Sequence, residues 1–338
     1  MPWFSQSESE PTPSPNPSLD EFREILAAAQ AGLEAVKTSE PVELVDGRAV
    51  FVPFLREGEE PKRDHITMEE ALKQGMEISE LRDQVARLRI HNPLKEKVLG
   101  VEGEVLKGCK QNRTLNTTLM VDAKTHLAVP VSCVEQGRWS APMGHMDKGV
   151  SHSPSNVRRA VRESVYKSKK DFGGYESNQG SVWENVQDYS KDAQETSASG
   201  NFDEVAEKEQ RKPEVSTVYR SLNAAAKGAT GYALAVGGNW VSAEMFGHSE
   251  DWKILGPSIL RGMAGEISRL HLSVAKPDSV HLEEDPRDGL FALLNEKAIA
   301  TRSPGLGWDL GAKSPDESVH LAALVEANQL RWLSALSR

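Results

Sequence analysis

Apolar residues recur near every third or fourth position in several segments of the chain, a pattern typical of helices with one buried face. The pattern is clearest over residues 19–36. The apolar face of that segment consists of Phe22, Ile25, Leu26, Ala29, Leu33 and Val36. The same periodicity predicts further helices over 68–74, from 153 to about 170, and over 180–192, 215–226, 252–270 and 287–297.

Two of these helices carry recognisable signals at their ends. Thr67 and Glu70 have the spacing of a capping box, and Gly75 suits the C-terminal end of that helix. Ser153 can cap the next helix, and Pro154 fits its first position. The polar, charged segment 193–213 shows no such pattern and is predicted to be a mobile excursion.

Shorter apolar runs bounded by glycine, proline or asparagine predict strands. Before the helical middle of the chain they lie at 42–45, 49–52, 77–81, 85–90, 98–106, 117–121 and 127–134. Asp46 and Gly47 form a typical hairpin turn between the first two runs. The order of elements therefore begins with a helix and continues mostly as sheet.

The chain returns to β character after the helical middle. Gly237 and Gly238 predict a turn between strands at 232–236 and 240–243. Residues 318–336 predict a final hairpin, although their alanine and leucine content also suits a helix.

These elements predict an α+β fold with a mostly antiparallel sheet, a helical middle segment and a final hairpin. Residues 1–18 are rich in proline and serine and predict a disordered tail. Residues 19–338 are then expected to form a single ligand-binding domain, with the mobile charged excursion near 193–213.

Composition and charge narrow the classes of function. The 338 residues are 38% hydrophobic and 27% charged, which is typical of a globular protein. A net charge of −10 disfavours general nucleic-acid binding, because phosphate contacts need clustered lysine and arginine. The two cysteines, Cys109 and Cys133, match no zinc spacing and favour a reducing compartment, although one disulfide stays open.

Targeting signals add little to this description. No run approaches the roughly 18 apolar residues of a membrane helix, and the N-terminus lacks the basic and apolar regions of a secretory signal. We therefore expect a cytoplasmic protein without a membrane partner.

Two polar segments adjoin strand-like runs and form the strongest candidate for a site: GCKQNRTLN at 108–116 and VSCVEQGRW at 131–139. Their cations, Lys110, Arg113 and Arg138, suit a phosphate or a carboxylate. Their amides can bind ribose hydroxyls or a base edge, and Trp139 can stack on a ring. The amides in question are Gln111, Asn112 and Asn116. The alternative is that the amides only build the loops and the arginines pair with nearby glutamates.

Glu135 and Glu104 are the best candidates for acid and base roles. Glu135 continues the row of Val131 and Cys133 from an apolar strand face into a glycine-containing loop. A partly buried carboxylate there needs partners and is a functional candidate, whereas Cys133 fits a small core residue. Two carboxylates can divide acid and base roles, but a solvated strand face would also explain Glu104.

Other reactive residues give weaker signals. Cys109 has Lys110 beside it, which could lower its pKa, but no histidine is placed to activate it. His145 and His152, with Asp147 between them, match no metal motif, so no protein metal site is expected.

Two helices offer further candidate surfaces. Gln179 and Trp183 open the helix at 180–192 and could complete an anion pocket, with capping and core packing as the alternative. The helix at 158–170 is basic and could bind a nucleic acid, although a solvated face fits the acidic chain better. Its cations are Arg158, Arg159, Arg162, Lys167, Lys169 and Lys170.

Three phrases in order, GCKQNRTLN, PVSCVEQGRW and QGSVW, resemble the ARG-and-rhodanese-phosphatase-superfamily-associated protein domain. The resemblance runs from about residue 50 into the C-terminal third, and it implies a role in handling ADP-ribose or a related NAD-derived nucleotide. Cys109 stands where the family is expected to have a small residue such as alanine. The motif residues are Glu104, Lys110, Gln111, Asn112, Arg113, Asn116, Glu135, Gln136, Arg138, Trp139, Gln179 and Trp183.

Taken together, we expect the two loops to bind an ADP-ribose-like or other phosphorylated nucleotide or sugar. If the protein is an enzyme, Glu135 and Glu104 would serve hydrolysis or transfer at a glycosidic or phosphoester bond. The alternatives are a non-catalytic nucleotide sensor or adaptor, and a nucleic-acid-associated protein using the basic helix. No cofactor is implied beyond magnesium arriving with a phosphorylated substrate.

Overall fold

The protein is described by a computed structural model that covers residues 16–82, 84–138, 144–277, 282 and 284–337. Within these residues the fold is α+β, and its strands pair antiparallel except for β4 (His65–Thr67) and β7 (Lys97–Gly100). The predicted fold class is therefore confirmed.

The largest sheet joins both ends of the chain. Its strands run in the order β1-β3-β13-β14-β18-β17-β16-β15, and β2 also pairs with β3. Their bounds are β1 (Val36–Thr38), β2 (Val42–Leu44), β3 (Ala49–Arg56), β13 (Gly231–Val236), β14 (Asn239–Phe246), β15 (Ile299–Arg302), β16 (Trp308–Lys313), β17 (Val319–Glu326) and β18 (Gln329–Ser337). The final hairpin lies in the middle of this sheet.

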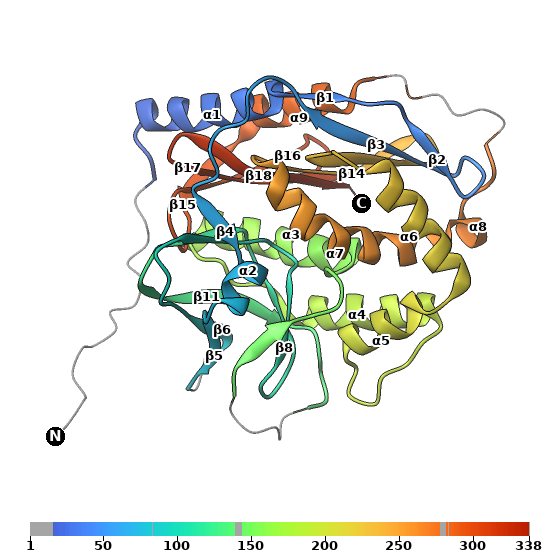
Figure 1. The fold of residues 1–338 in the computed structure, drawn as a ribbon, viewed down its shortest axis with the longest axis horizontal. Coiled ribbons are helices and arrows are strands. Elements are labelled where there is room, and N and C mark those ends of the chain that lie inside the picture. Colours follow the sequence, from blue (N-terminus) through green and yellow to red (C-terminus); the bar gives the residue numbers. More distant parts are fainter. Residues whose placement is uncertain (1–15, 83, 139–143, 278–281, 283, 338) are drawn as a thin grey trace.

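Helices cover both faces of the large sheet (Figure 1). On one face lie α1 (Leu19–Glu34) and α9 (Pro286–Lys297), and on the other α6 (Pro213–Ala225) and α7 (Ser249–Ser268). The short helix α8 (Leu270–Ser273) follows α7.

Successive side chains of the central strands pack into different cores because they point to opposite faces. In β18, Trp332 packs with the core beneath α6 and α7, whereas Leu333 packs with the core beneath α1 and α9. In β3, Phe51 and Phe54 divide in the same way. The near-continuous apolar run of the final hairpin reflects this burial on two sides.

A second body of sheet lies beyond α3, on the far side from α1 (Figure 1). A six-stranded sheet has the order β12-β8-β9-β11-β6-β5, and a three-stranded sheet has the order β10-β7-β4. The remaining bounds are β5 (Glu77–Leu81), β6 (Gln84–Asn92), β8 (Val105–Gly108), β9 (Arg113–Leu115), β10 (Leu119–Val121), β11 (Thr125–Cys133) and β12 (Met146–Lys148), with α2 at Met68–Lys73.

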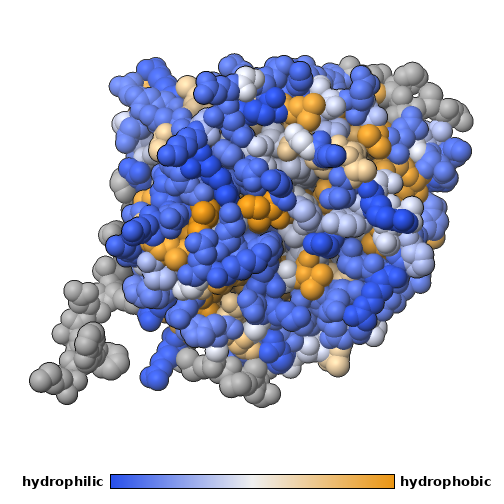
Figure 2. All heavy atoms as spheres, in the orientation of Figure 1, coloured by the Kyte–Doolittle hydropathy of each residue, from blue (hydrophilic) through white to orange (hydrophobic). Residues whose placement is uncertain are grey.

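Three helices complete the body: α3 (Ser155–Phe172), α4 (Gln179–Ala193) and α5 (Phe202–Gln210). Their apolar side chains pack together with Val105 and Val134 of the six-stranded sheet region. On the face seen in Figure 2, hydrophilic side chains predominate and apolar ones are scattered. No helix in the described part of the chain is both long and apolar enough to cross a membrane.

Several local predictions are confirmed. The capping box of α2 forms between Thr67 and Glu70, and Gly75 follows the helix with a φ of 99°. The hairpins at β2–β3, β13–β14 and β17–β18 all form, so the helical alternative for the C-terminus is wrong.

The predicted strand at 98–106 is in fact two strands, β7 and β8. Between them the chain turns at Gly103, which has a φ of 89° and therefore favours glycine. The carboxylate of Glu104 accepts the N–H of Val101 across this turn at 2.7 Å. A periodicity argument overlooked the turn because the apolar residues on both sides of it are buried.

Two other predictions need correction. Ser153 does not cap α3, because the N-cap is Pro154 and the Ser153 hydroxyl donates to Thr114 at 2.9 Å. The segment 193–213 is not simply an excursion, because it contains α5, whose Phe202 and Val205 are fully buried. Phe202, Val205 and Ala206 have the spacing of a buried helix face, which the polar and charged composition of the segment obscured.

Candidate functional site

The two polar phrases meet because β9 pairs antiparallel with β11. The register places Leu115 opposite Val131 and Arg113 opposite Cys133. The loop that leads into β9 therefore lies beside the loop that leaves β11. We call residues 109–113 and 134–138 together the loop cluster.

Glu135 and Arg138 form the centre of the loop cluster. Nε of Arg138 donates to Oε1 of Glu135 at 2.9 Å, and Nη2 donates to Oε2 at 2.8 Å. Arg138 also donates to the Cys109 carbonyl at 2.7 Å and to Oδ1 of Asn112 at 3.2 Å. One guanidinium thus joins both phrases, and its side chain remains 33% exposed.

Glu135 itself is buried and fully engaged. Besides Arg138, it accepts the Asn112 N–H at 3.1 Å and the Ser199 hydroxyl at 2.7 Å. Burial raises the pKa of Glu135, but these hydrogen bonds outweigh it and hold the pKa below its usual value. Glu135 is therefore ionised at neutral pH.

Two further segments, the start of α4 and the N-cap of α5, bind to the loop cluster and the end of β11. Asn201, the N-cap of α5, accepts a hydrogen bond from the Asn112 amide at 3.1 Å and bridges to Glu135 through the backbone. Gln179, in the first turn of α4, binds both backbone groups of Cys133, at 2.7 Å to its N–H and 2.9 Å to its carbonyl. Gln179 therefore extends the sheet pairing with a side chain.

Arg113 does not face the surface. Its side chain is 3% exposed, donates to Gln111 at 3.2 Å and lies 3.7 Å from the carboxylate of Glu80. Its Nε is buried without a partner among the described residues. Arg113 therefore lies where it shapes the loop rather than where a large ligand could reach it.

The other amides of the first phrase are also committed to the fold. Asn116 donates to the Tyr175 carbonyl at 2.9 Å and accepts the Ser132 hydroxyl at 2.5 Å. Gln111 donates to the Gln136 carbonyl at 3.3 Å. The alternative reading, in which amides build the loops, fits these two residues.

The exposed part of the loop cluster is small and basic. Lys110 and Gln136 are exposed, and Arg138 is partly so. Trp183 is half-buried with its indole N–H unpaired among the described residues. Trp139 lies outside the described residues.

Glu104 is not part of the loop cluster, and its carboxylate accepts a hydrogen bond from Val101 instead. It is buried in the turn after β7, and burial raises the pKa of its carboxyl despite the opposing Val101 hydrogen bond and Lys148 charge. Its neighbour Glu102 binds Arg162 through two hydrogen bonds of 3.0 and 2.8 Å. The alternative of a solvated strand face is therefore wrong for Glu104, and its neighbour Glu102 is buried as well.

The basic helix does not present the expected surface. Arg158, Arg162 and Lys169 are buried, and each pairs with a buried carboxylate: Arg158 with Glu244, Arg162 with Glu102 and Lys169 with Asp309. Only the other side of α3, with Lys167 and Lys170, is exposed. Three of the six expected cations are thus unavailable to a nucleic acid.

The two cysteines and His152 are buried in the fold. Cys109 and Cys133 are free and buried, and the Cys109 thiol donates to the Gly144 carbonyl at 2.9 Å. Burial raises the pKa of the Cys133 thiol. His152 is buried against the Glu102 carbonyl, and no metal-binding group of side chains occurs in the part of the chain that the structure covers.

Sequence reasoning missed three partners of the cluster: Glu80, Ser199 and Asn201. Ser199 and Asn201 lie in the segment interpreted as an excursion. Asn201 is followed by Asp203 and Glu204, which is the signature of a helix N-terminus and could have revealed α5.

Comparison with known proteins gives one match. The family model described as the ARG and Rhodanese-Phosphatase-superfamily-associated Protein domain matches residues 42–336, which include the loop cluster and both bodies of sheet. No curated protein and no solved structure shows a significant match.

Proposed function

The chain belongs to the ARG and Rhodanese-Phosphatase-superfamily-associated Protein domain family, and from this premise we propose that its loop cluster binds a phosphorylated nucleotide or sugar resembling ADP-ribose. Membership of this family supports the choice of ligand, because the resemblance implies a role in handling ADP-ribose or a related nucleotide. The geometry supplies the reason to place the ligand at this cluster.

One observation carries the proposal: a partly exposed arginine is fixed by four hydrogen bonds beside an exposed lysine in an acidic protein. Arg138 commits four hydrogen bonds to Glu135, Cys109 and Asn112. A guanidinium has five N–H donors, so one has no partner among the residues that the structure describes and could meet a ligand. Because the Arg138 side chain is already ordered, it loses little further conformational entropy when it binds a phosphate.

We assign different roles in ligand binding to the described residues. Lys110 and Arg138 hold the phosphate, and Gln136 contacts the sugar. Arg113, which is buried, keeps the loop in shape, and Gln179 fixes the end of β11. Arg113 was expected to bind the ligand, but in this proposal it supports the loop instead.

The geometry favours binding over proton transfer. Glu135 accepts four hydrogen bonds and has a lowered pKa, so it is a weak base and does not carry a proton to donate. Its role in this proposal is to position Arg138. We place the protein in the cytoplasm, and magnesium would arrive only with a phosphorylated ligand.

The test is a thermal-shift titration of the full chain with ADP-ribose, AMP, ribose phosphate and NAD, with and without magnesium. Ligand at about 100 times its dissociation constant stabilises the folded state by about 2.7 kcal/mol, which raises the melting temperature of a chain this long by about 4 °C. Lys110→Ala and Arg138→Ala should each weaken binding about tenfold or more, because each removes a charged hydrogen bond.

Lys170→Ala removes an exposed lysine from α3 and serves as the control, with unchanged binding expected. Absence of any shift with these phosphorylated compounds would refute the proposal. So would a shift that survives in both Lys110→Ala and Arg138→Ala.

The enzymatic alternative is tested on the same samples by following ADP-ribose breakdown. Turnover that disappears in Glu135→Gln while binding persists would establish a hydrolase or transferase with Glu135 at its centre. Binding without turnover would identify a sensor or adaptor, which is the outcome that the ionised Glu135 favours.

A further inference from the structure

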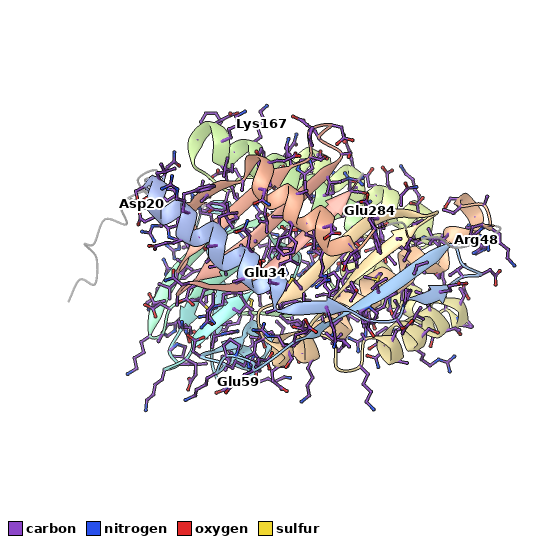
Figure 3. The ribbon with its side chains drawn as sticks, turned by 90° about the horizontal axis from the view of Figure 1, so that it is seen from above. Asp20, Glu34, Arg48, Glu59, Lys167 and Glu284 are labelled. Carbon is purple, nitrogen blue, oxygen red and sulfur yellow. The ribbon has the colours of Figure 1, made fainter. Side chains whose placement is uncertain are left out.

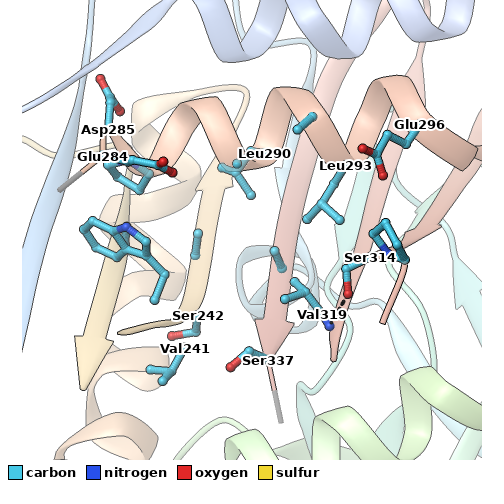
Figure 4. Close-up of a pocket in the computed structure, with 18 residues that line it drawn as sticks. Val241, Ser242, Glu284, Asp285, Leu290, Leu293, Glu296, Ser314, Val319 and Ser337 are labelled. Atoms are coloured by element: carbon cyan, nitrogen blue, oxygen red, sulfur yellow. Dashed lines mark hydrogen bonds between the residues drawn. The ribbon is translucent and has the colours of Figure 1, made fainter. Parts of the chain in front are cut away.

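A cavity of about 290 Å³ lies between α9 and the large sheet, away from the loop cluster. Figure 3 shows α9 beside α1 across this face of the sheet, and Figure 4 shows Leu290 and Leu293 projecting from α9 toward the strands. The floor comes from β13, β14, β17 and β18, including Trp240 and Val319. The cavity therefore has α9 on one side and the strands of the large sheet on the other.

The cavity exists because small residues stand where a helix usually packs larger ones against a sheet. Gly289 and Ala292 contribute to it from α9, and Ala243 and Ala335 from the strands. A Cβ added at Gly289 would meet nothing within 4 Å. Gly289 and Ala292 are exposed, so the cavity opens to solvent along α9, and its mostly apolar lining favours an occupant with an apolar body.

Two carboxylates stand at opposite ends of the cavity. Glu284 precedes α9 and Glu296 lies in its last turn, and Figure 4 places them on either side of the leucines. Both are exposed. The described residues that line the cavity include no lysine, arginine or histidine.

The third acidic residue of the rim is different. Asp285 is paired with Arg287 through several hydrogen bonds, the shortest of 2.6 Å, and it also caps α9. Its charge is thus already balanced, so the unbalanced negative charge is at the two ends. An anionic ligand is disfavoured there, and a ligand with a cation at each end is favoured.

We propose that this cavity binds an elongated organic dication: an aliphatic chain with a protonated amine at each end. The methylene chain would lie along Leu290 and Leu293, and the two ammonium groups would meet Glu284 and Glu296. This site is independent of the proposed nucleotide site.

The dimensions agree with such an occupant. Pro286 and Glu296 are ten positions apart within α9, about 15 Å between their Cα atoms at about 1.5 Å per helical residue, and Glu284 lies two positions farther on, before the helix begins. Octamethylenediamine spans about 11 Å between its nitrogens along a zigzag of bonds of about 1.5 Å. Two contacts of about 2.8 Å bring this to about 17 Å.

The experiment is isothermal titration calorimetry of the full chain with octamethylenediamine, octylamine and octanoate. The diamine should bind about fivefold more tightly than octylamine, because a second exposed charge pair adds a modest favourable interaction. Octanoate should not bind, because it would bring a third negative charge to the rim.

Two sets of variants, each with its own control, assign binding to the cavity. Glu284→Gln and Glu296→Gln should each weaken diamine binding about fivefold, whereas Asp288→Asn, on α9 but outside the lining, should leave it unchanged. Gly289→Leu fills the open space and should abolish binding, whereas Gly289→Ala should preserve it. Both Gly289 variants should fold, because glycine is a poor helix former.

Equal affinity for diamine and octylamine would overturn the proposal, because the second carboxylate would then have no role. Binding of octanoate as strong as that of octylamine would reduce the site to a plain apolar cavity and also overturn it. The same holds if diamine binding survives Gly289→Leu, or if no diamine binds at all.

Discussion

At the scale of single residues, the burial of a carboxylate does not determine its energetic role. Glu102 and Glu104 are both about 2% exposed and stand two positions apart. Glu102 lies between two arginines, 2.8 Å from Arg162 and 3.5 Å from Arg158. Glu104 has a backbone hydrogen bond and a raised pKa. Their partners therefore distinguish them.

This difference predicts losses of stability of different size for the same substitution. Glu102→Gln should destabilise the protein by about 3–5 kcal/mol, because it leaves the buried guanidinium of Arg162 without a counter-charge. Glu104→Gln should cost under about 1 kcal/mol at neutral pH, because glutamine keeps an acceptor for Val101 and removes a buried charge. Urea denaturation measures both, and equal losses would contradict the prediction.

Gln179 provides a second test at this scale. Its amide binds the N–H and the carbonyl of Cys133, so Gln179→Ala should cost about 1–3 kcal/mol by leaving backbone groups unpaired. Gln187→Ala on the same helix removes an exposed amide and should change stability by less than about 0.5 kcal/mol. If the two variants unfold at the same denaturant concentration, Gln179 does not fix the end of β11.

At the scale of elements, the sequence predicts a helix more readily than it predicts which face of the helix is buried. The periodicity of α3 is correct, but its cations divide between buried Arg158 and Arg162 and exposed Lys167 and Lys170. The buried arginines are satisfied by carboxylates from β14 and from the turn after β7. Such partners are distant in the sequence, so helix periodicity alone does not predict them.

The segment 193–213 shows the limit of composition as a guide to order. We predict that backbone amides of α5 exchange with solvent more slowly than those of residues 195–200. Phe202→Ala should destabilise the protein by about 3–5 kcal/mol, because the side chain is fully buried against Tyr189. Hydrogen exchange and denaturation test this, and fast exchange throughout 193–213 would restore the mobile excursion.

At the scale of the whole molecule, ion pairs connect parts that are far apart in sequence. The Asp64 carboxylate binds Lys97 and Arg331, while Asp251 of α7 binds Arg63 and His65. These pairs join β4, β7, β18 and α7, and so connect the three-stranded sheet to the large one. Burial raises the pKa of Asp64, but hydrogen bonds from Lys97 and Arg331 outweigh it and lower that pKa, so protonating Asp64 weakens the connection between the sheets.

The lowered pKa of Glu70 defines the pH range over which the stabilisation from its ion pair is lost. Burial raises its pKa, but hydrogen bonds from Arg63 and Thr67 outweigh this and lower the pKa to about 2 from an unperturbed 4.5. A lowered folded pKa means that its stabilisation is present above pH 4.5 and lost as the pH falls toward 2. Glu70→Gln should therefore lower stability at pH 7, with the difference from wild type shrinking on acidification.

Denaturation midpoints between pH 7 and about 2 measure this difference. Glu43→Gln, at an exposed position in β2, is the matched control and should leave the pH profile unchanged. A difference between Glu70→Gln and wild type that stays constant across the range would contradict the assignment.

The sequence by itself determined the type of most elements, with α5 as an exception, because apolar period, capping residues and glycine turns act over a few positions. It thus predicted α1, the α2 capping box, the final hairpin and the two phrases of the loop cluster. Only the tertiary structure decided that Arg138 is accessible and Arg113 is not, and that Ser199 and Asn201 complete the cluster. The physical reason is range: Asn112 and Asn201 are 89 positions apart, and burial depends on contacts that chain folding alone creates.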